Sequence, residues 1–202
     1  MSLNPTTTDE ERAAWLTRSR EAWNSRADGW DAMLEERPEQ RQMEMERALV
    51  ALALSPGMRL LDAGCGTGQW AVGFAHYGCE VTAIDLAPDM LQRARGHAAN
   101  AGVAIQFREG DIARIDDPDE TYDAIHCRCA IQFHPDPTSV LRELRRLIVP
   151  GGRLFISVPG ALSHIYASSW RRFIEPDTFN NRLVPWELEA LLHEFDWVVQ
   201  DG

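Results

Sequence analysis

The sequence predicts an α/β fold, in which helices cover both faces of an open and mostly parallel sheet. Short apolar runs that read as buried strands alternate with helix-length segments along most of the 202-residue chain. The most complete unit lies between Met58 and Leu86, where two such runs flank the helix-length segment 69–77. Parallel strands need a crossover of this length, so the pattern favours a doubly wound sheet.

The segment before this unit is predicted to be helical. Residues 10–34 read as a helix with breaks near 24–25 and 28–29. Pro38 suits the first turn of the next helix, which is expected to run to about Leu54.

Prolines and glycines mark the elements that follow the unit. Pro88 lies at the start of a predicted helix that Gly102 ends, and residues 150–152 turn the amphipathic helix 138–149 into a strand. The apolar pattern places the remaining elements, which are strands over 103–107, 122–127 and 153–158, a helix over 186–195 and a strand from 197.

Three glycines at alternate positions, Gly64, Gly66 and Gly68, follow the first strand of the unit. Glycine has no Cβ, so this turn bends sharply and lets a ligand approach the backbone. The helix after it directs its unpaired N–H groups at that ligand. Asp85 lies 21 positions after Gly64, where such units place a carboxylate that accepts from ribose hydroxyls. The unit therefore predicts a Rossmann-like site for a nucleotide-type ligand.

The spacing of the glycines departs from the dinucleotide fingerprint G-x-G-x-x-G, because the sixth position is Gln69. The run Leu-Asp-Ala-Gly-Cys-Gly-Thr-Gly over 61–68 instead resembles the first motif of class I S-adenosylmethionine (SAM)-dependent methyltransferases. Residues 128–137 resemble the fourth motif of that family, and 141–157 are similar to its fifth strand with the helix before it. The resemblance spans about 23–199 and implies an enzyme that uses SAM as cofactor and releases S-adenosylhomocysteine (SAH).

The resemblance also implies roles for individual residues. Asp62 is expected to hold the amino group of SAM, Asp85 the ribose and Asp111 the adenine amino group. Trp30 belongs to a segment similar to the family's entry segment, which folds over the methionine end; packing onto the sheet is the alternative for this tryptophan. The predicted cofactor-binding residues are Trp30, Asp62, Gly64, Cys65, Gly66, Gly68, Asp85, Leu86, Met90, Asp111, Ile112 and Cys127.

The implied reaction is in-line displacement of a methyl group onto a small-molecule acceptor held close to it. No side chain stands out as a base, but Gln132 and His134 lie past the end of the strand 122–127 and are candidates on the acceptor side. His126, on an apolar strand, reads as a core histidine. The aromatic and arginine-rich segment 159–184 is predicted to be a lid that favours an anionic acceptor, with surface packing as the alternative.

The remaining alternatives concern function and the end of the chain. The family usually adds a final antiparallel strand that this sequence does not show, so either the chain is a truncated form or its sheet is one strand short. The missing strand gives weight to a SAM-binding protein without catalysis, and an NAD-dependent oxidoreductase is kept as a second rival function. The expected single domain, 1–202, divides into N-terminal cap helices (1–54), a SAM-binding core (58–158), a lid (159–184) and a last helix and strand (185–202).

The amino-acid composition argues against several classes of cofactor and partner. All 20 basic residues are arginines, which excludes a P-loop and a pyridoxal Schiff base, since both need lysine. The net charge of −11 argues against a nucleic-acid partner. The four cysteines suggest neither a disulfide framework nor a metal site. The sequence shows no membrane-spanning run and no signal peptide, so a cytoplasmic protein is expected.

Overall fold

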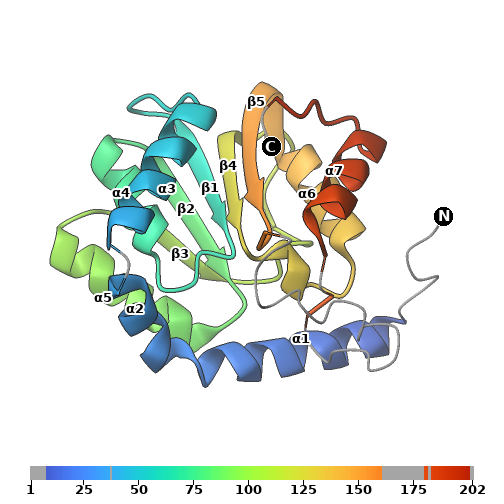
Figure 1. Ribbon diagram of the computed structural model, residues 1–202, viewed down its shortest axis with the longest axis horizontal. Helices are drawn as coiled ribbons and strands as arrows, with labels where there is room; N and C mark the ends of the chain where they lie inside the picture. The colour runs from blue at the N-terminus through green and yellow to red at the C-terminus, as the bar shows by residue number, and fades with distance from the viewer. Residues whose placement is uncertain (1–7, 37, 161–179, 182, 201–202) are drawn as a thin grey trace.

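The computed structural model describes residues 8–36, 38–160, 180–181 and 183–200. Its centre is a five-stranded sheet in the order β3-β2-β1-β4-β5, in which every pair of neighbours is parallel (Figure 1). The strands are β1 (Arg59–Ala63), β2 (Glu80–Asp85), β3 (Gln106–Glu109), β4 (Tyr122–Arg128) and β5 (Ile148–Ser157). The helices are α1 (Asp9–Asn24), α2 (Ala27–Glu35), α3 (Pro38–Ala51), α4 (Gln69–Tyr77), α5 (Pro88–Ala101), α6 (Pro137–Leu147) and α7 (Pro185–Glu194), with the short 3-10 helix η1 (Ile131–Phe133) after β4.

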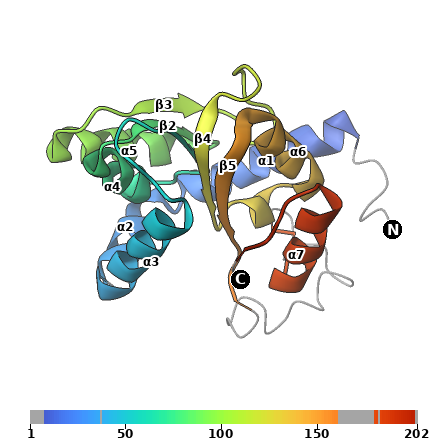
Figure 2. The same ribbon diagram turned by 90° about the horizontal axis from the view of Figure 1, so that it is seen from above.

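Helices pack on both faces of the sheet, as predicted (Figure 2). Side chains alternate along a strand, so neighbouring residues of β1 enter different cores. Leu60 is fully buried against α3 and α4, whereas Leu61 is fully buried in the core formed with α6 and α7. Burial on both faces explains why the strands read as short continuous apolar runs.

Two features of the fold prepare a ligand site. β1 lies between β2 and β4, so the strand order reverses at this point, and ligands of open α/β sheets bind at the carboxyl ends of such strands. The long helix α1 runs across those same ends (Figure 1). Thr8 and Glu11 cap its start reciprocally, since the Glu11 N–H donates to the Thr8 hydroxyl and the Thr8 N–H donates to the Glu11 carboxylate.

Three expected boundaries are wrong. No break occurs at 28–29, because both residues lie within the first turns of α2. The third strand begins at Gln106 rather than 103, since the Val103 N–H still bonds to the Ala98 carbonyl at the end of α5. Residues 197–200 form no strand, and the Trp197 N–H instead bonds to the Leu192 carbonyl.

The turn predicted at 150–152 is part of β5. Tyr122 pairs with Ile148 and Ala124 with Arg153, so the extra residues between these pairs form an irregularity within the strand. Among the described residues, no helix is long and apolar enough to cross a membrane.

Candidate cofactor-binding cavity

A cavity lies at the carboxyl ends of the strands and is lined by loops that follow β1, β2, β3 and β4, with residues of α1 and α2. The structure therefore brings together segments that are far apart in the sequence. The lining includes ten of the twelve residues predicted to bind the cofactor: Trp30, Asp62, Gly64, Cys65, Gly66, Asp85, Leu86, Met90, Asp111 and Ile112.

The glycine turn leaves room for a ligand at Gly66. This residue has a φ of +55°, and a Cβ built on it would meet only Trp30 Nε1, at 3.8 Å. Any side chain here would therefore enter the cavity as well as strain the backbone. Gly64 is required for a different reason, because a Cβ there would collide with Ala130.

Asp85 is held by backbone groups at the end of β2. The Gly66 N–H donates to one carboxylate oxygen at 2.8 Å and the Ala87 N–H donates to the other at 2.9 Å. Burial raises the pKa of Asp85 to about 6, although these two hydrogen bonds act in the opposite direction. Each oxygen can still accept a further hydrogen bond, so the carboxylate is fixed in place yet available to a ligand.

Asp111 follows β3 and is held mainly by side chains. It accepts hydrogen bonds from the Ala113 N–H at 2.9 Å and from the guanidinium of Arg12, on α1, at 2.6 Å. His134 Nε2 lies 3.2 Å from the same carboxylate. Burial by itself would raise the pKa of Asp111, but His134, the Ala113 N–H and Arg12 together hold it well below its usual range.

Asp62 and His126 form a buried pair beneath the cavity. They are direct partners across β1 and β4, and His126 Nδ1 lies 2.8 Å from Asp62 Oδ1. Both side chains are 2% exposed. Among the described residues, Asp62 Oδ2 and His126 Nε2 have no hydrogen-bond partner. His126 is thus a core histidine, as expected, but it also lines the cavity and keeps one nitrogen unpaired.

Aromatic side chains form the wall opposite the strands. Trp23 meets Trp30 edge-on with ring centroids 5.2 Å apart, and Phe133 edge-on at 4.8 Å. Trp15 supports this wall from outside the lining, since its Nε1–H donates to the Phe133 carbonyl at 3.1 Å. Trp23 and Trp30 come from α1 and α2, and α1 runs across the strand ends (Figure 1), so the N-terminal helices cover the cavity with tryptophans.

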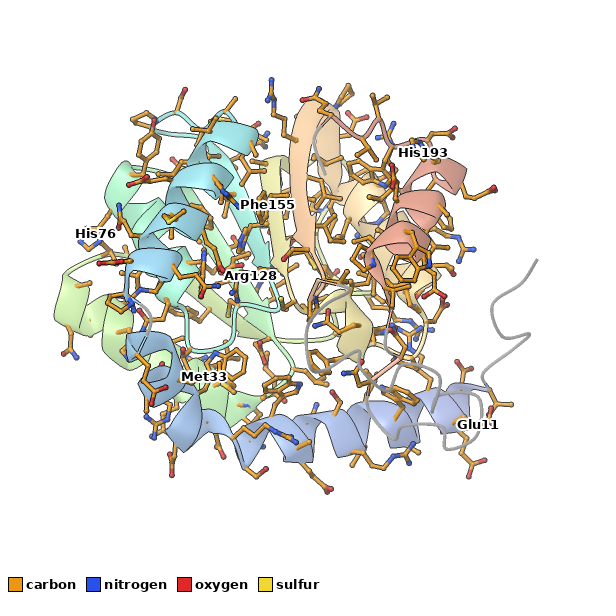
Figure 3. The ribbon with its side chains drawn as sticks, in the orientation of Figure 1. Glu11, Met33, His76, Arg128, Phe155 and His193 are labelled. Carbon is orange, nitrogen blue, oxygen red and sulfur yellow. The ribbon has the colours of Figure 1, made fainter. Side chains whose placement is uncertain are left out.

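Arg128 is the arginine in the cavity lining, and it lies near the centre of the molecule in Figure 3. Its guanidinium lies 4.2 Å from the centre of the Trp70 ring and pairs with Glu44 of α3 at 2.7 Å. His76 and His193 lie at the periphery in the same view and do not belong to this site (Figure 3).

Three predicted site residues lie outside the lining. Gly68 allows close packing of helices, since a Cβ there would lie 2.8 Å from the Cβ of Ala94 on α5. Cys127 is fully buried on the face of the sheet that packs against α6. Gln132 is 1% exposed, and its carbonyl accepts from the Asn181 N–H.

His134 does line the cavity, beside Asp111. Most of the predicted lid, 161–179 and 182, lies outside the described residues. The lining also includes residues that were not predicted individually: Leu16, Ser19, Trp23, Trp70, Gly110 and His126, and also Arg128, Cys129, Ala130 and Phe133, which lie in the segment that resembles the fourth motif. Trp23 lies in the predicted entry segment and Trp70 next to the glycine turn, so proximity to a motif was the available signal for these two.

Comparison with known proteins identifies the family. Residues 60–152 match a family model described as a methyltransferase domain. The ubiquinone biosynthesis O-methyltransferase of Xanthomonas axonopodis pv. citri is 31% identical over 182 residues, with 85% of this chain and 76% of that protein covered. The protein of the same name from Xanthomonas oryzae pv. oryzae is 32% identical over 154 residues, covering 72% of this chain and 64% of that protein.

Solved structures show the same fold. A putative SAM-dependent methyltransferase from Methanococcus maripaludis has a TM-score of 0.67 at 21% identity, covering 97% of this chain and 88% of that one. The [4+2]-cyclase SpnF also has a TM-score of 0.67, at 23% identity, covering 79% of this chain and 57% of that one. At these identities the likeness concerns the fold alone.

The residues present fit SAM. The turn at Gly66 leaves space for a ligand, and the unpaired oxygen of buried Asp62 can accept from the ammonium group at the methionine end. Asp85 and Asp111 at the strand ends can accept from hydroxyl and amino groups. The chain belongs to the class I SAM-dependent methyltransferases, enzymes that transfer a methyl group from SAM to a small-molecule acceptor.

Proposed function

We propose that the protein methylates a hydroxyl oxygen of a flat, largely apolar small molecule and releases SAH. The observation that carries this proposal is a single cavity, which joins the glycine turn and its acids to the aromatic wall of Trp23, Trp30 and Phe133. An aromatic wall favours a flat acceptor through stacking and burial of apolar surface. The relatives named O-methyltransferases support oxygen as the methylated atom.

In this proposal the cofactor is held by residues at the ends of β1, β2 and β3. Asp85 accepts from the ribose hydroxyls with the lone pairs that its backbone partners leave free. Leu86, Met90 and Ile112 enclose the adenine ring. Asp111 accepts from the adenine amino group and shares its carboxylate with Arg12.

When bound, SAM supplies a methyl group on a positively charged sulfur. The methyl group is already activated, so the main task of this chain is to hold the acceptor oxygen about 3–3.5 Å from it and in line with the breaking bond. The cover formed by α1 and α2 excludes water from this contact.

The described residues add little net positive charge for an acceptor, because Arg128 is paired with Glu44. The preference for an anionic acceptor rests on Arg171 and Arg172, which lie outside the described residues, and it remains a prediction. The net charge of −11 supports a small molecule over a nucleic acid.

The first experiment tests the cofactor. Mass spectrometry of the purified protein is expected to detect carried-over SAH or SAM, and calorimetry is expected to show binding of both. NADH serves as the control ligand. Binding of NADH without binding of SAM or SAH would reject the proposal in favour of the oxidoreductase alternative.

The second experiment tests the reaction. SAM with an isotope-labelled methyl group is incubated with the protein and a panel of phenols, aliphatic alcohols and amines, each group split into anionic and neutral members. We expect the label on the oxygen of a phenol-type acceptor, with one SAH formed for each methyl group transferred. SAM binding without transfer to any member would favour a SAM-binding protein without catalysis.

A further inference from the structure

Two buried polar atoms without partners belong to neighbouring residues of the cavity lining. Asp62 Oδ2 and His126 Nε2 belong to side chains that are 2% exposed, and neither atom has a hydrogen-bond partner among the described residues. A buried polar atom left unpaired costs about 1–3 kcal/mol, so such atoms call for an explanation. Both residues line the cavity, which indicates a ligand group.

We propose that His126 is a positioning residue, which acts through Asp62 to fix a carboxylate oxygen for the ammonium group of the methionine end of SAM. This proposal rests on the proposed function, because it assumes that SAM is the ligand of this cavity. It assigns a role to a histidine that the sequence alone placed in the core.

The hydrogen bond between the two residues determines which oxygen faces the ligand. A carboxylate oxygen accepts hydrogen bonds, so the donor in this contact is the N–H at His126 Nδ1, the atom 2.8 Å from Asp62 Oδ1. That bond uses one lone pair of Oδ1 and fixes the orientation of the carboxylate. Oδ2, which has no partner among the described residues, keeps both of its lone pairs for a ligand.

The aromatic surroundings hold the imidazole in this orientation. The His126 ring is nearly parallel to the rings of Trp70 and Phe155, with centroid distances of 6.4 and 5.5 Å. Phe74 meets it edge-on at 5.0 Å. The direct pairing of Asp62 and His126 across β1 and β4 sets the distance between their backbones. Both partners are therefore oriented before any ligand binds, which lowers the entropy lost on binding.

The charge around Asp62 favours a cationic ligand. Burial is the main reason why the pKa values of Cys65, Asp85 and Cys127 are raised, and the negative charge of Asp62 raises them further. The arginine in the lining, Arg128, is paired with Glu44 instead. An ammonium group at Oδ2 would supply the missing positive charge and relieve the repulsion between Asp62 and Asp85.

A second role for His126, as a base that takes the proton of the acceptor, fits the structure less well. Aromatic rings of Trp70, Phe74 and Phe155 pack around the imidazole, and the residue is 1% exposed. The experiment below is designed so that this role gives a different result.

The test compares two ligands that differ at the methionine end. SAH carries the amino group, whereas 5′-methylthioadenosine keeps the adenosine and the sulfur but has no amino-acid portion. We expect His126→Phe and Asp62→Asn to weaken SAH binding about tenfold or more, the scale of one charged hydrogen bond, and to leave 5′-methylthioadenosine within about threefold. A structural defect would instead weaken both ligands together.

The control variant is His126→Asn, because its side-chain amide can donate from nearly the position of Nδ1. It is expected to keep SAH affinity within about threefold of the wild type and to keep methyl transfer. His126→Gln, whose amide lies near the position of Nε2, is expected to behave like His126→Phe and replaces it if the latter does not fold by circular dichroism.

Three results would overturn the proposal. Equal weakening of both ligands by His126→Phe would indicate a structural role. Loss of SAH affinity in His126→Asn would show that the hydrogen bond to Asp62 is not what matters. Normal SAH binding by His126→Asn with loss of methyl transfer would indicate direct action of Nε2 on the acceptor. A wild-type protein that binds neither ligand would instead reject the proposed function itself.

Discussion

The ends of β2 and β3 each place an aspartate in the same cavity, but the two carboxylates are held in opposite ways. Asp85 is held by two uncharged backbone N–H groups, and burial raises its pKa to about 6. Asp111 accepts from the Ala113 N–H but is also held by the side chains of His134 and Arg12, and its pKa lies well below the usual range. Asp85 therefore has no charged partner of its own in the cavity, whereas Asp111 shares its charge with Arg12 and His134.

This difference separates two tasks of the cavity. The β2 end is organised by the glycine turn, whose Gly66 N–H holds Asp85 in place. The β3 end is organised by α1, which reaches Asp111 through Arg12 and so attaches the cover of the cavity to the sheet. We infer that the β2 end determines how tightly the cofactor binds. The β3 end determines how firmly α1 is attached over the cavity.

The largest expected effect is at the glycine turn. Gly66→Val places a branched side chain in the cavity and weakens the N–H contact to Asp85, so SAH binding should fall below detection by calorimetry. Most of the helical signal in circular dichroism should remain. The matched control is Gly102→Val, since Gly102 has a φ of +68° but no atom within 4 Å of a built Cβ. Normal SAH binding by Gly66→Val would mean that the turn does not contact the cofactor.

The comparison itself is tested by removing each acid in turn. Asp85→Ala should weaken SAH binding at least tenfold, about 1.4 kcal/mol or more, because it removes the acceptor for the ribose hydroxyls. Asp111→Ala should weaken it less, by about threefold, because Arg12 and His134 already engage that carboxylate. Calorimetry at pH 7.5 measures both. A larger loss at Asp111 than at Asp85 would reverse the assignment of the two ends.

Asp85 and Asp111 could be predicted from the sequence, because Asp85 ends one predicted strand and Asp111 comes shortly after another, which places both at the carboxyl edge of the sheet. The same local reasoning located the glycine turn. It could not tell which glycine faces the ligand: Gly64, Gly66 and Gly68 all have positive φ values, and only the neighbours in space distinguish them.

The contacts between distant segments were beyond the reach of local patterns. Asp62 and His126 are 64 positions apart, and their contact depends on the register of β1 against β4. Arg12 and Asp111 are 99 positions apart, and their ion pair depends on the course of α1 across the strand ends. Apolar periodicity predicts which face of an element is buried, but it carries no information about which polar groups then meet.

The third prediction concerns pH. Ionised Asp85 can accept from both ribose hydroxyls, whereas the protonated acid has one acceptor fewer and gains a donor. Its pKa of about 6 in the free protein means that SAH affinity should be constant above pH 7 and should fall progressively as the pH drops through 6. Asp111 stays ionised over this range because its pKa is lowered, so the attachment of α1 is not lost at the same time.

The control for the pH experiment is Asp85→Asn, which has no titrating group at this position and should bind SAH weakly but with a flat profile between pH 5 and 7.5. Calorimetry in buffers of matched ionic strength measures both proteins. A wild-type profile that is equally flat would show that Asp85 does not titrate in this range or does not contact the cofactor.

The smallest expected effect is at the contact between α1 and the β3 end. Arg12→Ala removes a partly buried ion pair in which both side chains are 16% exposed, so unfolding free energy should fall by about 1 kcal/mol. The pKa of Asp111 should rise toward its usual value. Because α1 then keeps fewer contacts with the sheet, limited proteolysis within 9–24 should become faster, and SAH should protect the segment less than in the wild type. SAH affinity itself should change less than about threefold, since Arg12 holds the cover and not the ribose.

The matched control is Arg114→Ala. The ion pair of Arg114 with Asp9 spans 4.0 Å between side chains that are 70% and 98% exposed, so its removal should alter neither stability nor proteolysis. If Arg12→Ala instead weakens SAH as strongly as Asp85→Ala, the two ends of the cavity do not have separate tasks, and α1 must be counted among the elements that determine cofactor affinity.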